Sequence, residues 1–137
     1  MKKILIFHTG GTISMLENKE TGAVHMTDEH PLTQLIDLYE EIADVDEQVI
    51  FDLPSPHMTP EHMLQLAQQI EKALPQYDGI VVTHGTDTLE ETAYFLDLVI
   101  HSEKPIILTG AMRSSNEIGS DALYNLISSL RVASEDD

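Results

Sequence analysis

The stretch GIVVTHGTDTLE, residues 79–90, indicates the fold most clearly. Residues 79–83 form a short, continuous apolar run, which is typical of a strand buried on both faces of a parallel sheet. A glycine turn follows, and Asp87 with Glu90 three residues later has the form of a capping box at the start of a helix. This stretch therefore predicts a buried strand that passes through a tight turn into a helix.

The same alternation runs through the rest of the chain. Apolar runs predict further buried strands at residues 3–8, 48–53 and 105–109. Apolar residues at helical spacing predict helices over residues 32–42, 60–74, 87–100 and 120–130. Residues 14–28 are polar and contain glycine, so we expect a mobile flap or an irregular hairpin there. The alternation predicts an α/β fold, a three-layer doubly wound parallel sheet of the flavodoxin-like or Rossmann-like kind with helices on both faces.

The length and charge of the chain limit the classes of function. Its 137 residues suit one compact domain, and 42% of them are hydrophobic, which is enough for a core. A formal charge of −17 argues against nucleic acid or an anionic membrane as the main partner. The chain has no cysteine, so disulfides and thiol catalysis are excluded. The first apolar run is too short for a signal peptide, so we expect a cytoplasmic protein.

Polar, glycine-containing clusters follow the predicted strands. They are Thr9-Gly10-Gly11-Thr12, Ser55-Pro56-His57, His84-Gly85-Thr86-Asp87 and Gly110-Ala111-Met112-Arg113-Ser114. In an open parallel sheet, ligands bind in the crevice outside the carboxyl ends of the strands. We therefore expect the four clusters, although distant in sequence, to converge on one edge of the sheet and form an active site.

Two of these clusters carry hydroxyls in positions suited to catalysis. The glycines before Thr12 permit a tight turn with open backbone amides, and the Thr12 hydroxyl could attack a carbonyl whose oxyanion those amides stabilise. An alternative interpretation is a strand-end turn with capping threonines. In the third cluster, Thr86 offers a second hydroxyl. Asp87 either caps the helix or binds a ligand ammonium, and both roles are compatible.

The other polar residues favour structural interpretations. Arg113 either clamps a carboxylate or ties its own turn to Glu117 or Asp121, and we favour the tie. No metal site is expected, because His57 and His62 are five residues apart and span Pro60, so they do not share one helix face.

Taken together, these motifs resemble those of the L-asparaginase family. Thr9-Gly10-Gly11-Thr12-Ile13 resembles the first asparaginase signature, and His84-Gly85-Thr86-Asp87-Thr88 resembles the second. Residues 110–113 are similar to the stretch after the family's next strand, and residues 52–63 resemble its substrate-binding segment. The similarity covers essentially the whole chain. It implies that residues 1–137 are the N-terminal α/β domain of a two-domain subunit whose C-terminal domain is absent from this chain.

The resemblance also implies a reaction and roles for named residues. Thr12 would form an acyl-enzyme with the side-chain amide of asparagine and release ammonia, and water would then release aspartate. Thr86 and Asp87 would form the second catalytic group. Asp87 would hold the substrate α-amino group, Ser55 its α-carboxylate, and amides near Gly11 and Thr86 the oxyanion. No metal or organic cofactor is expected, and members are usually homotetramers or dimers.

This sequence departs from the family pattern in three ways. Residues 14–28 contain no tyrosine, although the family commonly has one in its flap. Pro56 and His57 stand where relatives often have polar and acidic residues, which leaves asparagine against glutamine preference open. The lysine that relatives pair with the second signature is not within residues 1–137, and Lys104 is no substitute because it precedes a strand. A chain that ends here, before the next expected strand, is expected to be a truncated one that is nearly inactive alone.

Three other functions are alternatives to hydrolysis of asparagine. A subunit that supplies ammonia to an amidotransferase would carry the same threonines. A flavodoxin-like module that binds a phosphate ligand would use the glycine turns, but the acidic charge and the missing phosphate-loop lysine argue against it. A purely structural fragment would use its hydroxyls as helix caps, and it does not easily explain two threonine–glycine signatures.

Overall fold

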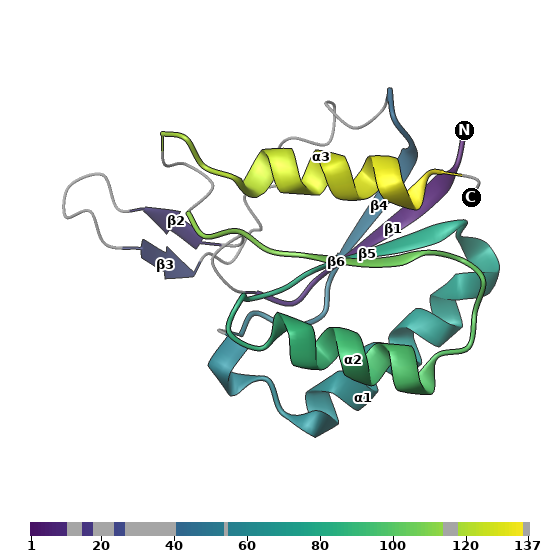
Figure 1. Ribbon diagram of the computed structural model, residues 1–137, viewed down its shortest axis with the longest axis horizontal. Coiled ribbons are helices and arrows are strands. Elements are labelled where there is room, and N and C mark those ends of the chain that lie inside the picture. Colours follow the sequence, from purple (N-terminus) through teal and green to yellow (C-terminus); the bar gives the residue numbers. More distant parts are fainter. Residues whose placement is uncertain (11–14, 18–23, 27–40, 54, 114–117, 136–137) are drawn as a thin grey trace.

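The computed structural model describes residues 1–10, 15–17, 24–26, 41–53, 55–113 and 118–135. These residues form a four-stranded parallel sheet in the order β4-β1-β5-β6. The strands are β1 (Lys3–His8), β4 (Asp44–Val49), β5 (Gly79–Thr83) and β6 (Ile106–Thr109). Helix α3 (Ala122–Ala133) covers one face, and helices α1 (Pro60–Ala73) and α2 (Leu89–Val99) cover the other (Figure 1). The three layers confirm the predicted α/β fold.

The central strands β1 and β5 are apolar on both faces because both faces are covered. Successive strand residues point to opposite sides of a sheet. Ile4 and Ile6 of β1 therefore pack with Leu126 and Leu130 of α3. The intervening Leu5 and Phe7 pack with the buried residues of α1 and α2 on the opposite face. The predicted bounds of β1 and β5 are confirmed to the residue.

The strand predicted at residues 48–53 is wrong in its bounds. Strand β4 covers Asp44–Val49 and pairs in parallel with β1 from Lys3↔Asp44 to His8↔Val49. It is an edge strand whose residues are largely exposed, so it needs no apolar run. The apolar residues Ile50 and Phe51 lie beyond the strand and pack against the core under α1 and α2.

The described helices begin where local chemistry favours a helix start. At α1, the Thr59 hydroxyl accepts from the His62 backbone N–H while the His62 ring accepts from the Thr59 N–H, which forms a capping box. The capping box predicted at Asp87 is wrong, because α2 has Thr88 as its N-cap and no capping bond from that side chain.

Strand β6 and helix α3 begin within two residues of their predicted starts. The helix expected over residues 32–42 falls almost wholly outside the described residues.

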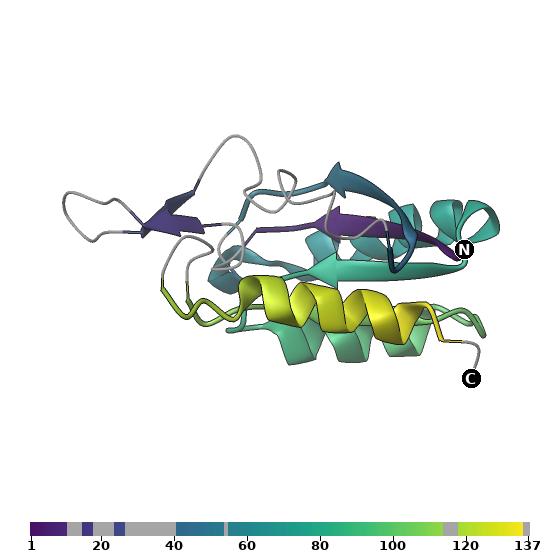
Figure 2. The same cartoon turned by 90° about the horizontal axis from the view of Figure 1, so that it is seen from above.

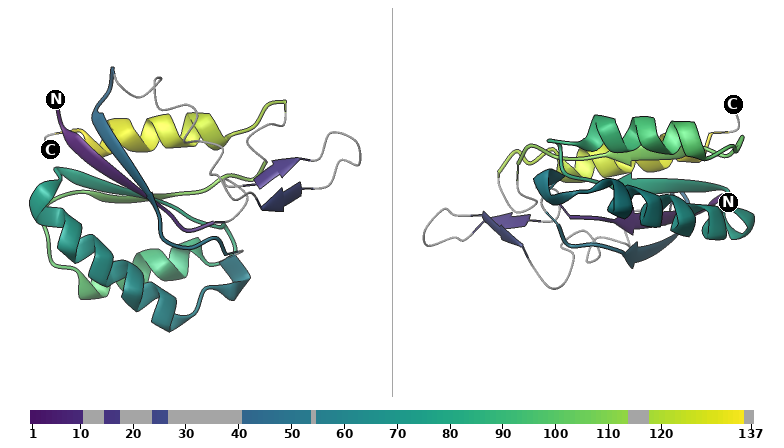
Figure 3. Two further views of the ribbon diagram at one scale, coloured as in Figure 1. Left: turned by 180° about the vertical axis from the view of Figure 1, so that it is seen from behind. Right: turned by 90° about the horizontal axis from the view of Figure 1, so that it is seen from below.

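Short elements complete the described part of the chain. Strands β2 (Met15–Glu17) and β3 (Val24–Met26) pair antiparallel, which agrees with the hairpin of the two alternatives, flap or hairpin, expected for residues 14–28. This hairpin extends beyond the carboxyl ends of the parallel strands (Figures 2 and 3). The 3₁₀ turns η3 (Ser55–His57) and η4 (Leu74–Gln76) lie before and after α1. No helix of the described chain is long and apolar enough to cross a membrane.

The sheet reverses its winding direction beside β1. After β1 the chain continues to β4 on one side of that strand and then to β5 on the other side. This reversal is a topological switch point, where open α/β sheets leave a crevice at the carboxyl ends of the diverging strands. In this sheet the switch point falls between β1 and β5.

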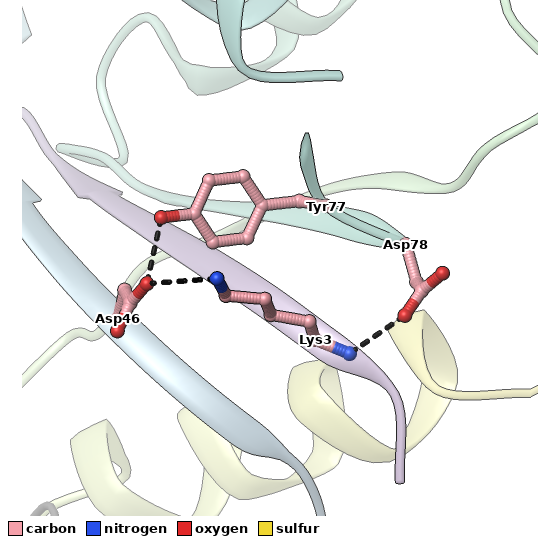
Figure 4. A network of polar contacts seen from close by, with 4 residues as sticks. All are labelled: Lys3, Asp46, Tyr77 and Asp78. Atoms are coloured by element: carbon pink, nitrogen blue, oxygen red, sulfur yellow. Dashed lines mark hydrogen bonds and ion pairs between the residues drawn. The ribbon is translucent and has the colours of Figure 1, made fainter. Parts of the chain in front are cut away.

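Polar side chains join the opposite, amino ends of the same strands (Figure 4). We call Lys3, Asp46, Tyr77 and Asp78 the amino-end network. The Tyr77 hydroxyl donates to Asp46 Oδ2 at 2.7 Å, and Lys3 Nζ lies 3.9 Å from the same oxygen. The backbone N–H of Lys3 donates to Asp78 Oδ2 at 2.8 Å. The hydrogen bond to Asp46, together with burial, raises the pKa of Tyr77 to about 12.

Candidate active site

Backbone hydrogen bonds bring the carboxyl ends of the four strands together. The backbone N–H of Thr9 and its hydroxyl both donate to the carbonyl of Thr83, at 3.1 and 2.7 Å. The N–H of Leu53 donates to the Thr9 carbonyl, and the N–H of His84 donates to the Thr109 carbonyl. The described parts of the first, third and fourth clusters therefore meet at one edge of the sheet, and Leu53, just before the second cluster, joins them there.

Two glycines allow these turns to lie in direct contact. Gly10 has φ +115°, and a Cβ there would overlap the backbone of Leu53. A Cβ on Gly110 would lie 2.7 Å from the carbonyl oxygen of His84 and 3.2 Å from Thr86 Cγ2. Only glycine permits both close approaches. The first turn therefore packs on the segment before Ser55, and the fourth packs on the turn that carries Thr86.

The buried side chain of His84 holds the turn between β5 and α2. Its Nδ1 donates to the Gly85 carbonyl at 2.7 Å, and its Nε2 lies 2.8 Å from the Thr92 hydroxyl on α2. A carbonyl only accepts, so Nδ1 carries the proton and the neutral ring accepts at Nε2 from Thr92. Burial lowers the pKa of His84 and favours this neutral form. The backbone of His84 and Gly85, directly before Thr86, is thereby held by hydrogen bonds in the interior of the protein.

The predicted residues of the third cluster lie on the open side of this turn. Thr86 and Asp87 are exposed, directly after the buried pair His84 and Gly85. Asp87 lies outside α2 and is not its N-cap. Both side chains are thus accessible at the switch point.

The other predicted site residues are described less fully. Gly11 and Thr12 lie outside the described residues, so their positions stay predictions. The backbone of Ser55 opens the turn η3, two residues after Leu53, and the structure describes no more of Ser55.

The fourth cluster is held by an aspartate. The Asp121 carboxylate accepts from the backbone N–H groups of Met112 and Arg113, at 2.9 to 3.1 Å. These bonds lower the pKa of Asp121, the bond from Met112 contributing most. The Arg113 guanidinium donates to the Ile118 carbonyl at 3.3 Å. The expected tie to Asp121 therefore exists, but the backbone of Arg113 makes it.

Sequence reasoning missed three buried polar side chains at the same edge. His8 Nδ1 lies 2.8 Å from the Thr83 hydroxyl, and His8 Nε2 lies 3.0 Å from Glu47 Oε1. A histidine that ends a buried apolar strand was the available signal, because such a side chain needs polar partners.

Other features lie away from this edge. A hollow of about 420 Å³ between α2 and β6 is lined mainly by apolar residues such as Leu96, Ile100 and Ile107. Lys104 lies before β6, and its ammonium donates to the carbonyl of Leu74, which precedes β5. Lys104 is therefore at the amino-end edge, as expected. Within the described residues, no group of three or more His, Asp or Glu side chains could hold a metal ion.

Known proteins resemble the chain in sequence and in fold. A family model described as "Asparaginase, N-terminal" matches residues 3–137. An L-asparaginase of Bacillus licheniformis is 43% identical over 131 residues, covering 91% of this chain and 39% of that protein. One of the subunits of a glutamyl-tRNA(Gln) amidotransferase from Archaeoglobus fulgidus is 37% identical over 135 residues, covering 97% of this chain and 32% of that protein.

A solved structure agrees with these sequence matches. The crystal structure of a probable cytoplasmic L-asparaginase from Campylobacter jejuni superposes with a TM-score of 0.87 at 37% identity, over 99% of this chain and 41% of that one. The chain thus spans 32% to 41% of the length of these relatives. With a family model that matches nearly all of its residues, and with this fold, the chain belongs to the asparaginase family.

Proposed function

We propose that residues 1–137 are the N-terminal, nucleophile-bearing domain of an L-asparaginase. The protein hydrolyses the side-chain amide of L-asparagine to L-aspartate and ammonia. The observation that carries this proposal is the pair of bonds from Thr9 to the Thr83 carbonyl at the switch point. Thr9 comes three residues before Thr12, and Thr83 comes three residues before Thr86. The two signatures therefore leave neighbouring strands at the same edge.

In the proposed mechanism, the Thr12 hydroxyl attacks the amide carbon of asparagine. Backbone amides near Gly11 and Thr86 donate to the oxyanion that forms. The C–N bond then breaks, the nitrogen gains a proton and leaves as ammonia, and an ester links the substrate to Thr12. Water attacks this ester, which releases aspartate and restores the hydroxyl.

The remaining roles concern binding and proton transfer. Asp87 binds the α-ammonium group of the substrate, and Ser55 binds its α-carboxylate. Thr86 belongs to the second catalytic group with Asp87. The positioned base of that group is a lysine outside residues 1–137, in the remainder of the two-domain subunit. No metal or organic cofactor takes part in these steps.

Relatives in amidotransferases support a second candidate function. Glutamyl-tRNA(Gln) amidotransferase subunits from Archaeoglobus fulgidus and Methanococcus maripaludis are 37% and 38% identical to this chain. A protein of that kind would use the same threonine to supply ammonia to a partner enzyme. Glutamine as a much better substrate than asparagine, with ammonia transfer to a partner, would favour this candidate.

Cellular location and assembly are also part of the proposal. We place the protein in the cytoplasm as a homo-oligomer, a dimer or tetramer when full-length. The Campylobacter jejuni structure is of a probable cytoplasmic L-asparaginase, whereas a relative from Haemophilus influenzae is named a probable L-asparaginase, periplasmic. Cell fractionation and light scattering test the two statements separately.

The nucleophile is tested with Thr12→Ala in the complete protein. This substitution removes the attacking oxygen, so ammonia release should fall at least about 10³-fold while binding of asparagine stays within a few-fold. Ammonia release is followed in a coupled assay and binding by calorimetry, with Thr12→Ser as the control that keeps a hydroxyl. A Thr12→Ala protein that still hydrolyses asparagine well would remove Thr12 from this role.

The ammonium site is tested in the same assays with Asp87→Ala. Loss of the carboxylate should raise the apparent KM for asparagine about tenfold or more. Asp97→Ala, which removes an exposed aspartate within α2, is the control and should leave KM unchanged. An Asp87→Ala protein with unchanged KM would contradict the assignment.

A further inference from the structure

Three buried side chains connect three strands at their carboxyl ends. His8 ends β1, Thr83 ends β5, and Glu47 lies on the edge strand β4. The His8 ring contacts the Thr83 hydroxyl through Nδ1 at 2.8 Å and the Glu47 carboxylate through Nε2 at 3.0 Å. We call these three residues the carboxyl-end clasp. They stand outside the catalytic and binding roles proposed above.

Burying the polar side chains of the clasp costs free energy. The side chain of His8 is fully buried and that of Glu47 is 7% exposed. Glu47 Oε2 is also buried and has no hydrogen-bond partner among the described residues. Buried polar pairs of this kind are often no more stabilising than apolar residues of the same volume. Fold stability alone therefore gives a weak reason for the clasp, whereas a requirement for one fixed geometry gives a better one.

The strands that the clasp joins are those that lead into the proposed site. Strand β1 leads to Thr12, β5 leads to Thr86 and Asp87, and the chain after β4 leads to Ser55. The residue after His8, Thr9, donates twice to the carbonyl of Thr83. A shift of Thr83 therefore disturbs two contacts together, that of its hydroxyl with His8 and that of its carbonyl with Thr9.

From this geometry we propose that His8, Glu47 and Thr83 are positioning residues for the nucleophile-bearing turn. The clasp fixes the end of β1 relative to β4 and β5, and so fixes the attacking hydroxyl relative to the groups that bind the substrate. This inference rests on the proposed function. Because misplacement of reacting groups by about 1 Å can cost about 10²-fold in rate, loosening the clasp lowers kcat more than it changes KM.

The test compares the clasp with the amino-end network of the same strands. Thr83→Val removes the hydroxyl that contacts His8 and keeps nearly the same shape, while Thr83→Ser keeps the hydroxyl. Glu47→Gln keeps an oxygen that can accept from His8 Nε2. Tyr77→Phe is the matched control, because it removes one hydroxyl that bonds to β4 at the other end. All variants are made in the complete protein and assayed at a temperature where circular dichroism shows them fully folded.

With asparagine as substrate, Thr83→Val should lower kcat about tenfold or more and leave KM within about threefold. Thr83→Ser and Glu47→Gln should recover most of the wild-type kcat, since each retains the contact in question. Tyr77→Phe should keep both constants within about twofold of wild type. The proposal is wrong if Thr83→Val has the kcat of Tyr77→Phe.

A second measurement does not depend on catalysis. The backbone amides of Thr9, Leu53 and His84 hold the turns, and those of Asp44 and Asp78 donate to the carbonyls of Lys2 and Lys3 at the amino end of β1. In hydrogen exchange followed by NMR, Thr83→Val should accelerate the first group about tenfold and leave the second unchanged. Uniform exchange changes in both groups would overturn the positioning role. If the wild-type protein fails to hydrolyse asparagine and Thr83→Val still shows the expected exchange pattern, the proposed function is refuted instead.

Discussion

His8 and His84 lie at the ends of neighbouring strands, yet they serve opposite faces of the sheet. His8 contacts Thr83 and Glu47 on the face covered by α3, whereas His84 contacts Thr92 of α2 on the other face. The alternation of side chains along a strand explains this arrangement, because Thr83 and His84 are adjacent in sequence. Single residues thus hold the edge of the sheet from both sides.

The buried state of His84 predicts a dependence of stability on pH. Burial lowers the pKa of His84 in the folded protein below its ordinary value of 6.5, so the unfolded chain takes up the proton first as pH falls. The contribution of neutral His84 is complete above pH 6.5 and is lost as pH falls towards the folded-state pKa. Urea unfolding at about pH 8 and about pH 5 measures this loss.

His84→Asn supplies the comparison for that measurement. This variant lacks the titrating ring, so its free energy of unfolding should fall less between the two pH values than that of the wild type. His101→Asn, which changes an exposed histidine, should behave as the wild type does. Equal pH dependence in the His84→Asn and wild-type proteins would contradict the prediction.

At the scale of elements, the bounds of a strand could be predicted where the strand is buried and not where it is exposed. Strands β1 and β5 could be predicted to the residue because their apolar runs are buried on both faces. Strand β4 could not, because it lies at an edge and alternates polar with half-buried residues. Its bounds follow from parallel pairing with β1, which is information that no local pattern contains. The predicted start of α2 was wrong because aspartate is a residue type typical of N-caps, yet Asp87 is not the N-cap of this helix.

The contact between the first turn and the segment after β4 predicts a specific intolerance to substitution. Gly10→Ala places a Cβ at φ +115° and into the backbone of Leu53, so unfolding free energy should fall by about 2 kcal/mol or more. Gly119 also has positive φ, +76°, but a Cβ there meets nothing closer than 3.5 Å. Gly119→Ala should therefore cost only about 1 kcal/mol. Equal losses in urea unfolding would show that the overlap at Leu53 is relieved.

At the scale of the whole molecule, topology predicted which polar turns lie together, whereas the long-range pairing of buried side chains could not be predicted. The turns that follow β1, β5 and β6 meet at one edge, whatever their separation in sequence. The clasp could not be predicted, because His8 meets partners that are 39 and 75 residues away. Nothing next to Glu47 in the sequence indicates that its side chain is buried against a histidine.

Residues 1–137, prepared as a separate protein, should fold but have little activity. The two core clusters lie within this chain, so it should fold at least in part. Without the proposed lysine, ammonia release from asparagine should be at least about 10²-fold below that of the complete protein. Circular dichroism and the coupled ammonia assay measure the two properties on one sample. Ordinary enzymatic turnover by this chain alone would overturn the assignment of the base.

The sheet is fastened differently at its two ends, and dissolved salt distinguishes them. At one end, the Lys3 and Asp46 side chains are 46% and 50% exposed, so mobile ions in the solvent surround and weaken their attraction. At the other end, His8 and Glu47 are shielded from solvent, and ionic strength barely reaches them. High salt should therefore weaken the pair of Lys3 and Asp46 at the amino ends of the strands and leave the contact of His8 with Glu47 at the carboxyl ends nearly unchanged.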